Sequence, residues 1–457
     1  MNLLVKDKCF YKKMAVIAIP ISLQSMITIG VNMTDTVMVG KLGETSLSAT
    51  ALANQFVNIY QICCMGIAMG ASVLTSRFWG MQDITSLKKT ITLMLRLCIV
   101  LAVLFMLPTI LIPQLLMRMY TNDSAVIAQG VQYFKWMVYC YFLQGMTMTC
   151  TIVLRSVGQV NFPLFTSIGS FFVNILFNYM FIFGKLGVPR MEVEGAGVGT
   201  LIARVFEFSL ICGYFLFVDR KIGYRLKDLR MKCNSLIKDY VSISIPVFVS
   251  DSLLALGTSA VAMVMGRIGT GFVSANSITV VTQQLTTVII QGICHASCIM
   301  TGHTLGQGER EMAQQQAWTF LILGLVVGIL GGGLIKVLSR PIIGLYNITP
   351  ETAQIAGELM DAIAFIVIFQ SMNSILTKGV LRGGGDTKFL MVADIIFLWA
   401  ASLPLGILAG LVWHLDAFWI YVFLKIDQIC KSIWCVFRLR SGKWIKTFSK
   451  EKMNHAQ

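Results

Sequence analysis

The sequence predicts an all-α integral membrane protein with twelve transmembrane helices, arranged as two six-helix lobes related by pseudo-two-fold symmetry. Three observations predict this fold class: long apolar stretches recur along the whole chain, basic residues gather in alternate connections, and the second half repeats the first. Of the 457 residues, 56% are hydrophobic and 13% are charged, and the mean hydropathy is +0.74. Soluble domains average about 45–50% apolar and about 25% charged residues, so most soluble folds are excluded.

Each apolar stretch has about 18 residues or more, which lets a helix cross a hydrocarbon core of roughly 30 Å. A helix satisfies its own backbone hydrogen bonds and is therefore the expected spanning element. The predicted spans are 14–39, 49–75, 91–113, 131–154, 162–184, 195–217, 241–265, 274–301, 317–338, 353–380, 388–411 and 416–438. The first stretch is too long for a signal-peptide core and has no small-residue cleavage site, so we expect it to remain as the first span.

The basic residues indicate the orientation of the chain. A formal net charge of +15 would suggest a nucleic-acid partner for a soluble protein, but here Lys and Arg lie in alternate connections, which is the orientation signal of membrane proteins. With both termini inside, the cytoplasmic segments hold about two dozen Lys and Arg against about seven outside. We therefore expect a multi-pass protein of the inner (cytoplasmic) membrane with both termini cytoplasmic, surrounded by membrane lipid and without a nucleic-acid partner.

The second half of the chain repeats the first at a nearly fixed offset. Ile19-Pro20 returns as Ile245-Pro246, 226 residues later. Leu154-Arg155 followed by Gly158 returns as Leu381-Arg382 followed by Gly385. Six spans in each half give both copies the same orientation, as in transporters built from two parallel bundles with substrate bound near the midplane. The predicted domains are an N-terminal six-helix lobe at 1–217, a basic cytoplasmic linker at 218–240, a C-terminal six-helix lobe at 241–438 and a basic cytoplasmic tail at 439–457.

Asp35 lies in the first span, about five residues from its outer end. An ionisable side chain at such a depth costs about 2.5–3.5 kcal/mol on insertion scales and commonly faces a functional cavity, although a residue near a span end can also reach the headgroups. Asn174, Asn178 and Thr200 lie at a similar outer depth in the fifth and sixth spans. Together these groups could ligate a small cation, with Asp35 and Asn178 as a possible sodium site, or could hold a protonatable acid by hydrogen bonds.

Arg204 and Glu207 follow Thr200 at spacings of four and three, which places all three on one helix face. The simplest interpretation is an Arg204–Glu207 ion pair that locks the bundle. The alternative is that Arg204 biases Asp35 toward its charged form or competes with cations for it. The sequence leaves both open.

The second half also carries polar side chains within its spans. Asp427 and Lys431 are four residues apart, and we expect them to form a structural ion pair. Asp251 and Asp394 are equally compatible with a cavity and with a structural role. Uncharged amides in spans two and eight could form interhelical hydrogen bonds or contact a solute, namely Gln55, Asn58, Gln61, Gln283 and Gln284. The candidate substrate-cavity residues are Gln55, Arg204, Glu207, Asp251, Gln283, Gln284 and Asp394.

Several motifs, taken in order, resemble the multidrug and toxic compound extrusion (MATE) transporters of the NorM and DinF kind. The matching pieces are Ile19-Pro20, Asp35-Thr36-Val37-Met38-Val39-Gly40, Gly80, Leu154-Arg155 with Gly158, Asn174-Ile175-Leu176-Phe177-Asn178, Gly195-Ala196-Gly197-Val198-Gly199-Thr200, Leu381-Arg382-Gly383 and Arg440-Ser441-Gly442-Lys443-Trp444. The resemblance covers essentially the whole chain. It implies a V-shaped pair of lobes that exports amphipathic, often cationic compounds by antiport against sodium ions or protons. It also implies that Asp35 is the coupling residue, with Asn174, Asn178 and Thr200 as its partners.

Two departures leave the coupling ion open between sodium and proton. DinF-like members often have an aspartate where this chain has Asn178, and NorM-like members place an acid where this chain has Ser371. We expect a monomeric secondary antiporter of small amphipathic molecules, not an enzyme, with no cofactor. The alternatives are a lipid-linked oligosaccharide or lipid flippase, which would favour a strongly cationic cavity, a polytopic membrane enzyme and a passive channel.

Overall fold

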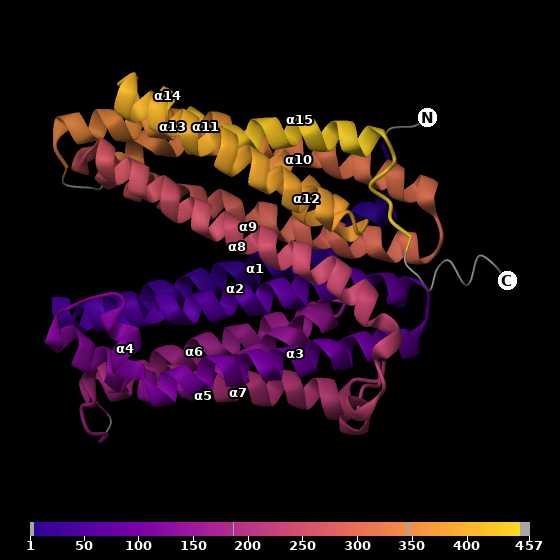
Figure 1. Cartoon of the computed structure of the whole chain (residues 1–457), viewed down its shortest axis with the longest axis horizontal. Coiled ribbons are helices and arrows are strands. Elements are labelled where there is room, and N and C mark those ends of the chain that lie inside the picture. Colours follow the sequence, from indigo (N-terminus) through magenta and orange to yellow (C-terminus); the bar gives the residue numbers. More distant parts are fainter. Residues whose placement is uncertain (1–3, 186, 345–347, 448–457) are drawn as a thin grey trace. The chain divides into compact units, whose positions relative to one another are not determined.

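The computed structural model describes residues 4–185, 187–344 and 348–447, and every regular element in these ranges is helical. The first half contains α1 (Lys8–Gly40), α2 (Glu44–Gly80), α3 (Ile84–Leu111), α4 (Pro113–Arg118), α5 (Ser124–Ser156), α6 (Asn161–Phe183) and α7 (Glu192–Gly213) (Figure 1). The second contains α8 (Asn234–Ile268), α9 (Thr270–Gly306), α10 (Arg310–Ile343), α11 (Pro350–Ser374), α12 (Thr387–Asp394), α13 (Leu403–Ile407), α14 (Ala417–Leu424) and α15 (Ile426–Arg440). Short π-helical turns extend α7 and α11 and join α12 to α13.

The helices agree closely with the predicted spans, and the all-α membrane fold class is confirmed. Eleven helical segments among the described residues are long and apolar enough to cross a membrane, and each corresponds to one predicted span. The predicted span 416–438 differs, because it consists of the shorter helices α14 and α15. Lys425 interrupts them with φ −120° and ψ 15°, so the two helices share no continuous hydrogen-bond ladder.

Side-chain and backbone contacts divide the chain into two compact units, which we call the first and second units. The first consists of Leu23–Ser244, and the second consists of the described residues up to Ser22 together with those from Ile245 onward. This division departs from the predicted lobe 1–217 at its start, because the first part of α1 belongs to the second unit. A close approach explains this: a Cβ added to Gly292 of α9 would lie 2.0 Å from Ser22 Oγ.

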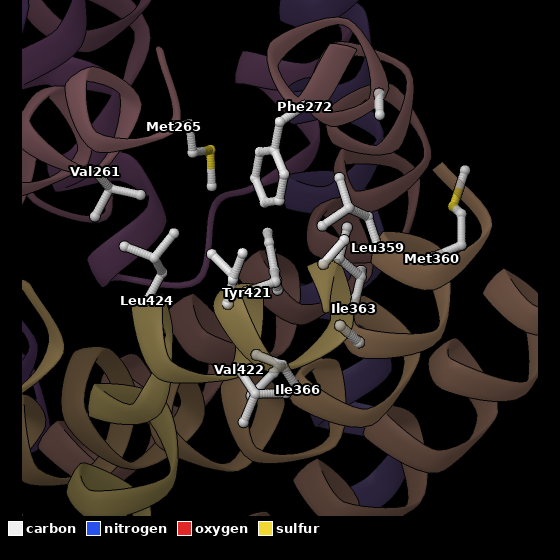
Figure 2. Close-up of a cluster of buried hydrophobic side chains, with 14 of the residues drawn as sticks. Val261, Met265, Phe272, Leu359, Met360, Ile363, Ile366, Tyr421, Val422 and Leu424 are labelled. Carbon is white, nitrogen blue, oxygen red and sulfur yellow. The ribbon is translucent and has the colours of Figure 1, made fainter. Parts of the chain in front are cut away.

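Each unit is a bundle of helices around its own core. In the first unit α5 packs against α2, α3 and α7, and α6 packs against α7. In the second unit α11 packs against α9, α10, α14 and α15. Figure 2 shows part of the second core, where Tyr421 and Leu424 of α14 meet Phe272 of α9 and Leu359 of α11. Apolar side chains at these positions are almost fully buried, so the end of α14 is held firmly.

The repeated Leu-Arg motif ends a helical segment in the same way in both halves. Gly158 has φ +79° and Gly385 has φ +85°, a left-handed conformation that favours glycine. The amide of the next residue then bonds back to the repeated leucine, from Gln159 to Leu154 and from Asp386 to Leu381. The sequence repeat is therefore also a repeat of local backbone geometry.

The predicted basic linker 218–240 belongs to the first unit and contacts α3. Lys88 of α3 donates a hydrogen bond of 2.6 Å to the carbonyl of Gly223 and forms an ion pair of 2.9 Å with Asp228. Arg96 donates to the carbonyl of Leu229 at 2.6 Å. These bonds fix the connection along α3. Of the predicted basic tail 439–457, residues 448–457 lie outside the described chain.

Candidate functional site

A cavity of about 360 Å³ lies inside the first unit. Residues of α1, α2, α5, α6 and α7 line it, and its wall mixes polar and apolar side chains. Five of the predicted residues face this cavity: Asp35, Asn174, Thr200, Arg204 and Glu207. Residues up to 172 positions apart in the sequence therefore meet at one place, as expected when adjacent helices bring polar residues of one depth together.

The Asp35 carboxylate lies at one end of a short hydrogen-bonded chain, with Asn178 at its centre. Asn178 Nδ2 donates to Asp35 Oδ1 at 2.6 Å and to Asn174 Oδ1 at 3.3 Å. Both asparagines are almost fully buried, at 2% exposure for Asn174 and 1% for Asn178, whereas Asp35 is half-buried. The asparagines therefore hold the carboxylate from the protein side, and the cavity reaches it from the other side.

A glycine-rich segment of α7 lets α6 come close enough to place Asn178. A Cβ added to Gly199 would lie 2.1 Å from Asn178 Oδ1 and 2.8 Å from its backbone nitrogen. A Cβ added to Gly195 would lie 2.5 Å from the backbone carbon of Phe181, also on α6. Small residues commonly mark such close helix contacts in membrane proteins. Glycine is therefore required at positions 195 and 199, because a side chain at either position would clash with α6.

Arg204 and Glu207 form the predicted ion pair, with Arg204 Nη1 at 2.8 Å from Glu207 Oε2. Both residues also line the cavity. The pair is formed within α7 and joins no second helix, so its presence is confirmed, and an influence of Arg204 on Asp35 stays a prediction. Among the described residues no basic side chain forms an ion pair with Asp35, so Asp35 is the one charged group of the cavity wall without such a partner.

The cavity also contains polar residues of α2. The sequence predicts Asn58 and Gln61 as groups that contact a solute or a neighbouring helix, but it did not single out Asn54. Asn54, Asn58 and Gln61 of α2 line the cavity, and Tyr133 of α5 donates to Asn54 Oδ1 at 3.2 Å. Spacings of four and three place these three α2 residues on one helix face, which is the signal that could have found Asn54. The predicted Gln55 is exposed and does not line the cavity, because it lies one position outside that face.

The predicted residues of the second half do not gather at a single place. Asp394 lines a separate cavity of about 210 Å³ inside the second unit. Asp251 instead accepts from Arg382 at 3.0 and 3.5 Å. Gln283 donates to Gln370 at 2.7 Å. Gln284 is exposed, and neither Gln283 nor Gln284 lines the second-unit cavity.

The residues around Asp35 have the chemistry to bind a small hard cation. Carboxylate and amide oxygens are the ligands that such ions prefer. Asp35, Asn174 and Thr200 line the cavity and could supply oxygen ligands. Asn178 Oδ1 is buried against Gly199 without a hydrogen-bond partner, and Asn178 does not line the cavity. Histidine, cysteine and carboxylate side chains form no group of three or more in the described part of the chain, so this arrangement differs from a zinc-type centre.

Comparison with known protein families shows which family this chain belongs to. The MatE family model matches residues 20–180 and 246–429, which includes both halves and the Asp35 region. The chain belongs to the MatE family. It is a multi-pass membrane transporter, and the resemblance drawn from its motifs is confirmed. The two matched segments start at the repeated prolines Pro20 and Pro246, so the family match follows the internal repeat.

Curated relatives and solved structures agree with this assignment. The "Probable multidrug resistance protein NorM" of Thermotoga maritima is 24% identical over 441 residues, covering 95% of this chain and 93% of that protein. The "Uncharacterized transporter YisQ" of Bacillus subtilis is 24% identical over 419 residues, covering 90% of each chain. A mutant of the Vibrio cholerae MATE transporter VcmN superposes with a TM-score of 0.86 at 16% identity, covering 95% of this chain and 97% of that one. A MOP superfamily transporter from Pyrococcus furiosus gives 0.83 at 19% identity, with the same coverage.

Proposed function

We propose that this MatE transporter exports amphipathic organic compounds, cationic ones in particular, in exchange for sodium ions or protons. The observation that carries the proposal is the environment of Asp35. Its carboxylate lies in a cavity of about 360 Å³, hydrogen-bonded to Asn178 and without an ion pair among the described residues. An unpaired carboxylate in a span is costly unless it binds a proton or a cation during the transport cycle.

The same cavity supports an amphipathic substrate. Its wall combines apolar side chains such as Ile27, Val31 and Met137 with uncharged polar groups such as Asn58 and Gln61. Binding sites for small molecules typically combine a mainly apolar lining with a few polar groups. Relatives that carry the name "Probable multidrug resistance protein NorM" support drugs and toxins as the compound class.

In the mechanism that we propose, the coupling ion and the substrate compete for one charged site. A proton or sodium ion entering from outside neutralises Asp35 and weakens the attraction that holds a cationic substrate, so the substrate leaves. The protein then changes from outward to inward access, releases the ion to the cytoplasm and binds a new substrate. This is alternating access around a central site. Arg204 is held by Glu207 at 2.8 Å, which limits its competition for Asp35.

The setting follows from the same reasoning. We propose that the chain functions in the inner (cytoplasmic) membrane with both termini in the cytoplasm, because Lys and Arg are concentrated in the connections on that side. We also propose that it functions as a monomer. A lipid or oligosaccharide flippase would need a strongly cationic cavity for pyrophosphate headgroups. The first-unit cavity contains a single arginine, which is paired, so we favour the antiporter.

The test is efflux of ethidium from loaded proteoliposomes, with a sodium gradient and a proton gradient imposed separately. Asp35→Asn is compared with the wild type and with Asp361→Asn. Asp361 is the matched control, because it is an acid within a predicted span whose partner is Lys336 and it does not line the first-unit cavity. We expect one gradient to drive efflux in the wild type and Asp361→Asn, and a loss of at least about tenfold, equivalent to about 1.4 kcal/mol, in Asp35→Asn. Full gradient-driven efflux by Asp35→Asn would overturn the mechanism.

A further inference from the structure

The cavity of the second unit differs in charge from that of the first. Its wall holds four basic and two acidic side chains, namely Lys378, Arg382, Lys425, Lys431, Asp394 and Asp427. The lining therefore has a formal charge of +2, or +1 when Asp251 behind Arg382 is included. In the first-unit cavity the charged lining residues are Asp35, Arg204 and Glu207, which leaves a formal charge of −1.

Two of the four basic groups are neutralised by the protein. Lys431 Nζ lies 3.0 Å from Asp394 Oδ1 and 3.0 Å from Asp427 Oδ2. Arg382 Nη2 lies 3.0 Å from Asp251 Oδ1. Each of these cations is almost fully buried, at 2% exposure for Lys431 and 5% for Arg382, and each is matched by carboxylates. The predicted Asp427–Lys431 pair is thereby confirmed.

Lys378 and Lys425 are not neutralised in this way. Neither ammonium group has an ion pair or a hydrogen bond with any side chain or carbonyl in the described chain. Lys378 follows α11 on its π-helical extension, and Lys425 separates α14 from α15. Lys378 is exposed and Lys425 is half-buried, so both side chains are accessible at the cavity. Two unpaired positive charges on one cavity wall favour an anionic ligand.

The cavity also has unused hydrogen-bonding groups. Arg382 Nε is a buried donor without a partner, and Asn373 Oδ1 and Asp427 Oδ1 are buried acceptors without a partner. The other polar atom of each acceptor side chain is already hydrogen-bonded. Asn373 Nδ2 donates to Gln428 Oε1, and Gln428 Nε2 donates to Asp427 Oδ2, each at 2.7 Å. Unpaired acceptors on residues that line the cavity, beside two unpaired ammonium groups, favour a ligand that carries an anionic group with a hydrogen-bond donor close to it.

The interruption at Lys425 places this side chain at the cavity. Transporters commonly build their substrate sites where a membrane helix is discontinuous. Leu424 is fully buried in the core shown in Figure 2, which fixes the preceding turn, and Asp427, Gln428 and Lys431 follow on the same cavity wall. The residue at the break in the twelfth predicted span, Lys425, therefore also carries a positive charge without an ion pair among the described residues.

We propose that the second-unit cavity binds the anionic group of an amphipathic ligand, a carboxylate or phosphate ester with an adjacent hydrogen-bond donor, through Lys378 and Lys425. This inference rests on the proposed transport function for its biological setting, but binding itself can be measured without transport. The source of the anion is either a transported solute or an anionic lipid headgroup, and the experiment separates them.

The probe is dansyl-phenylalanine, an amphipathic carboxylate with a sulfonamide N–H next to the carboxylate, compared with its uncharged methyl ester. Fluorescence titration of the purified full-length protein gives both affinities. The variants are Lys378→Gln, Lys425→Gln and their combination. Lys388→Gln is the matched control, because Lys388 is an exposed, unpaired lysine of α12 that does not line the cavity.

We expect the wild type and Lys388→Gln to bind the acid at least tenfold more tightly than the ester. The combined variant should lose that preference while keeping its affinity for the ester and its thermal unfolding midpoint, which shows that it remains folded. Equal affinity of the wild type for acid and ester would overturn the proposal, and so would an unchanged preference in the combined variant. If the combined variant does not fold, Lys425→Arg and Lys378→Arg must retain the preference that the single glutamine variants lose.

Native mass spectrometry in the presence of phosphatidylglycerol identifies the source of the anion. Phosphatidylglycerol retained by the wild type, lost in the combined variant and displaced by dansyl-phenylalanine would support a lipid at this site. Gradient-driven efflux of dansyl-phenylalanine that requires both lysines would support a transported solute. The failures are distinguishable: loss of the acid preference with intact ethidium efflux would overturn this inference alone, and absence of all efflux with an intact acid preference would overturn the proposed function alone.

Discussion

Asn178 donates from Nδ2 to Asp35 Oδ1 at 2.6 Å, and the amide oxygen of the same side chain faces Gly199 without a hydrogen-bond partner. One side chain thus connects the charged residue of α1 with the closest contact between α6 and α7. The amide nitrogen holds Asp35 in place, while the amide oxygen is buried against the glycine-rich segment of α7. The position of Asn178 therefore governs the orientation of Asp35.

Gly199→Ala tests this relationship without altering a polar group. The added methyl carbon would lie 2.1 Å from Asn178 Oδ1 and 2.8 Å from the Asn178 nitrogen, so α6 and α7 must separate. We expect gradient-driven ethidium efflux to fall at least about tenfold and the free energy of unfolding to fall by about 1–3 kcal/mol. Gly213→Ala, at the end of the same helix, is the control, because nothing lies within 4 Å of its added Cβ. Wild-type efflux by Gly199→Ala would contradict the role assigned to Asn178.

The Asp251–Arg382 pair should stabilise the second unit through its burial. Asp251→Asn leaves the buried Arg382 guanidinium without its carboxylate, and breaking such a pair typically costs about 3–5 kcal/mol. The double variant Asp251→Asn/Arg382→Gln should lose less than the sum of the two single variants, because no unpaired charge remains. Chemical unfolding in detergent measures each loss. For comparison, Lys336→Gln breaks an exposed ion pair and should cost about 1 kcal/mol or less. Strict additivity in the double variant would show that the pair is not coupled.

Much of the fold could be predicted from the sequence, because the apolar stretches and the repeat depend on local composition. The same reasoning placed Asp35, Asn174 and Thr200 together, since residues at one depth of adjacent spans must meet. The site residues remain a prediction until transport is measured. The sequence indicates which polar side chains lie at the same depth. It does not indicate which of them are hydrogen-bonded to each other.

The interruption at Lys425 could not be predicted, because no proline or glycine occurs within residues 417–438 to mark a break. The break depends on how Tyr421 and Leu424 pack in the core of the second unit, which is a tertiary effect. The grouping of the first part of α1 with the second unit has a similar origin. It depends on the close contact of Gly292 with Ser22, and no pattern in either segment alone indicates that contact.

The motif near the end of the described chain should also anchor the second unit. Trp444 is fully buried, its ring lies against Gly384, and its Nε1 donates to Gln314 Oε1 at 2.8 Å. Trp444→Ala should lower the free energy of unfolding by about 3–5 kcal/mol, as is typical when a buried aromatic side chain is removed. Trp419→Ala, at a position that is 51% exposed, should have a smaller effect. Equal losses measured by chemical unfolding would show that the docking of Trp444 contributes no special stability.

The connection between α7 and α8 should respond to pH through Asp228, which lies outside the spans. Burial raises the pKa of this carboxyl, but the hydrogen bond from Lys88, the backbone N–H of Arg225 and nearby positive charges outweigh it, so the pKa lies below its ordinary value. The stabilisation is therefore present above the unfolded-state pKa of about 3.9 and is lost as pH falls through the lower folded-state pKa. We expect Asp228→Asn to unfold at a lower temperature than the wild type near neutral pH, and the two midpoints to converge in acid. Lys227→Gln, which leaves Asp228 and Lys88 in place, should keep most of the wild-type pH dependence. A difference between Asp228→Asn and the wild type that persists unchanged at the lowest pH would mean that the side chain stabilises the connection by its shape, because its charge would then be absent.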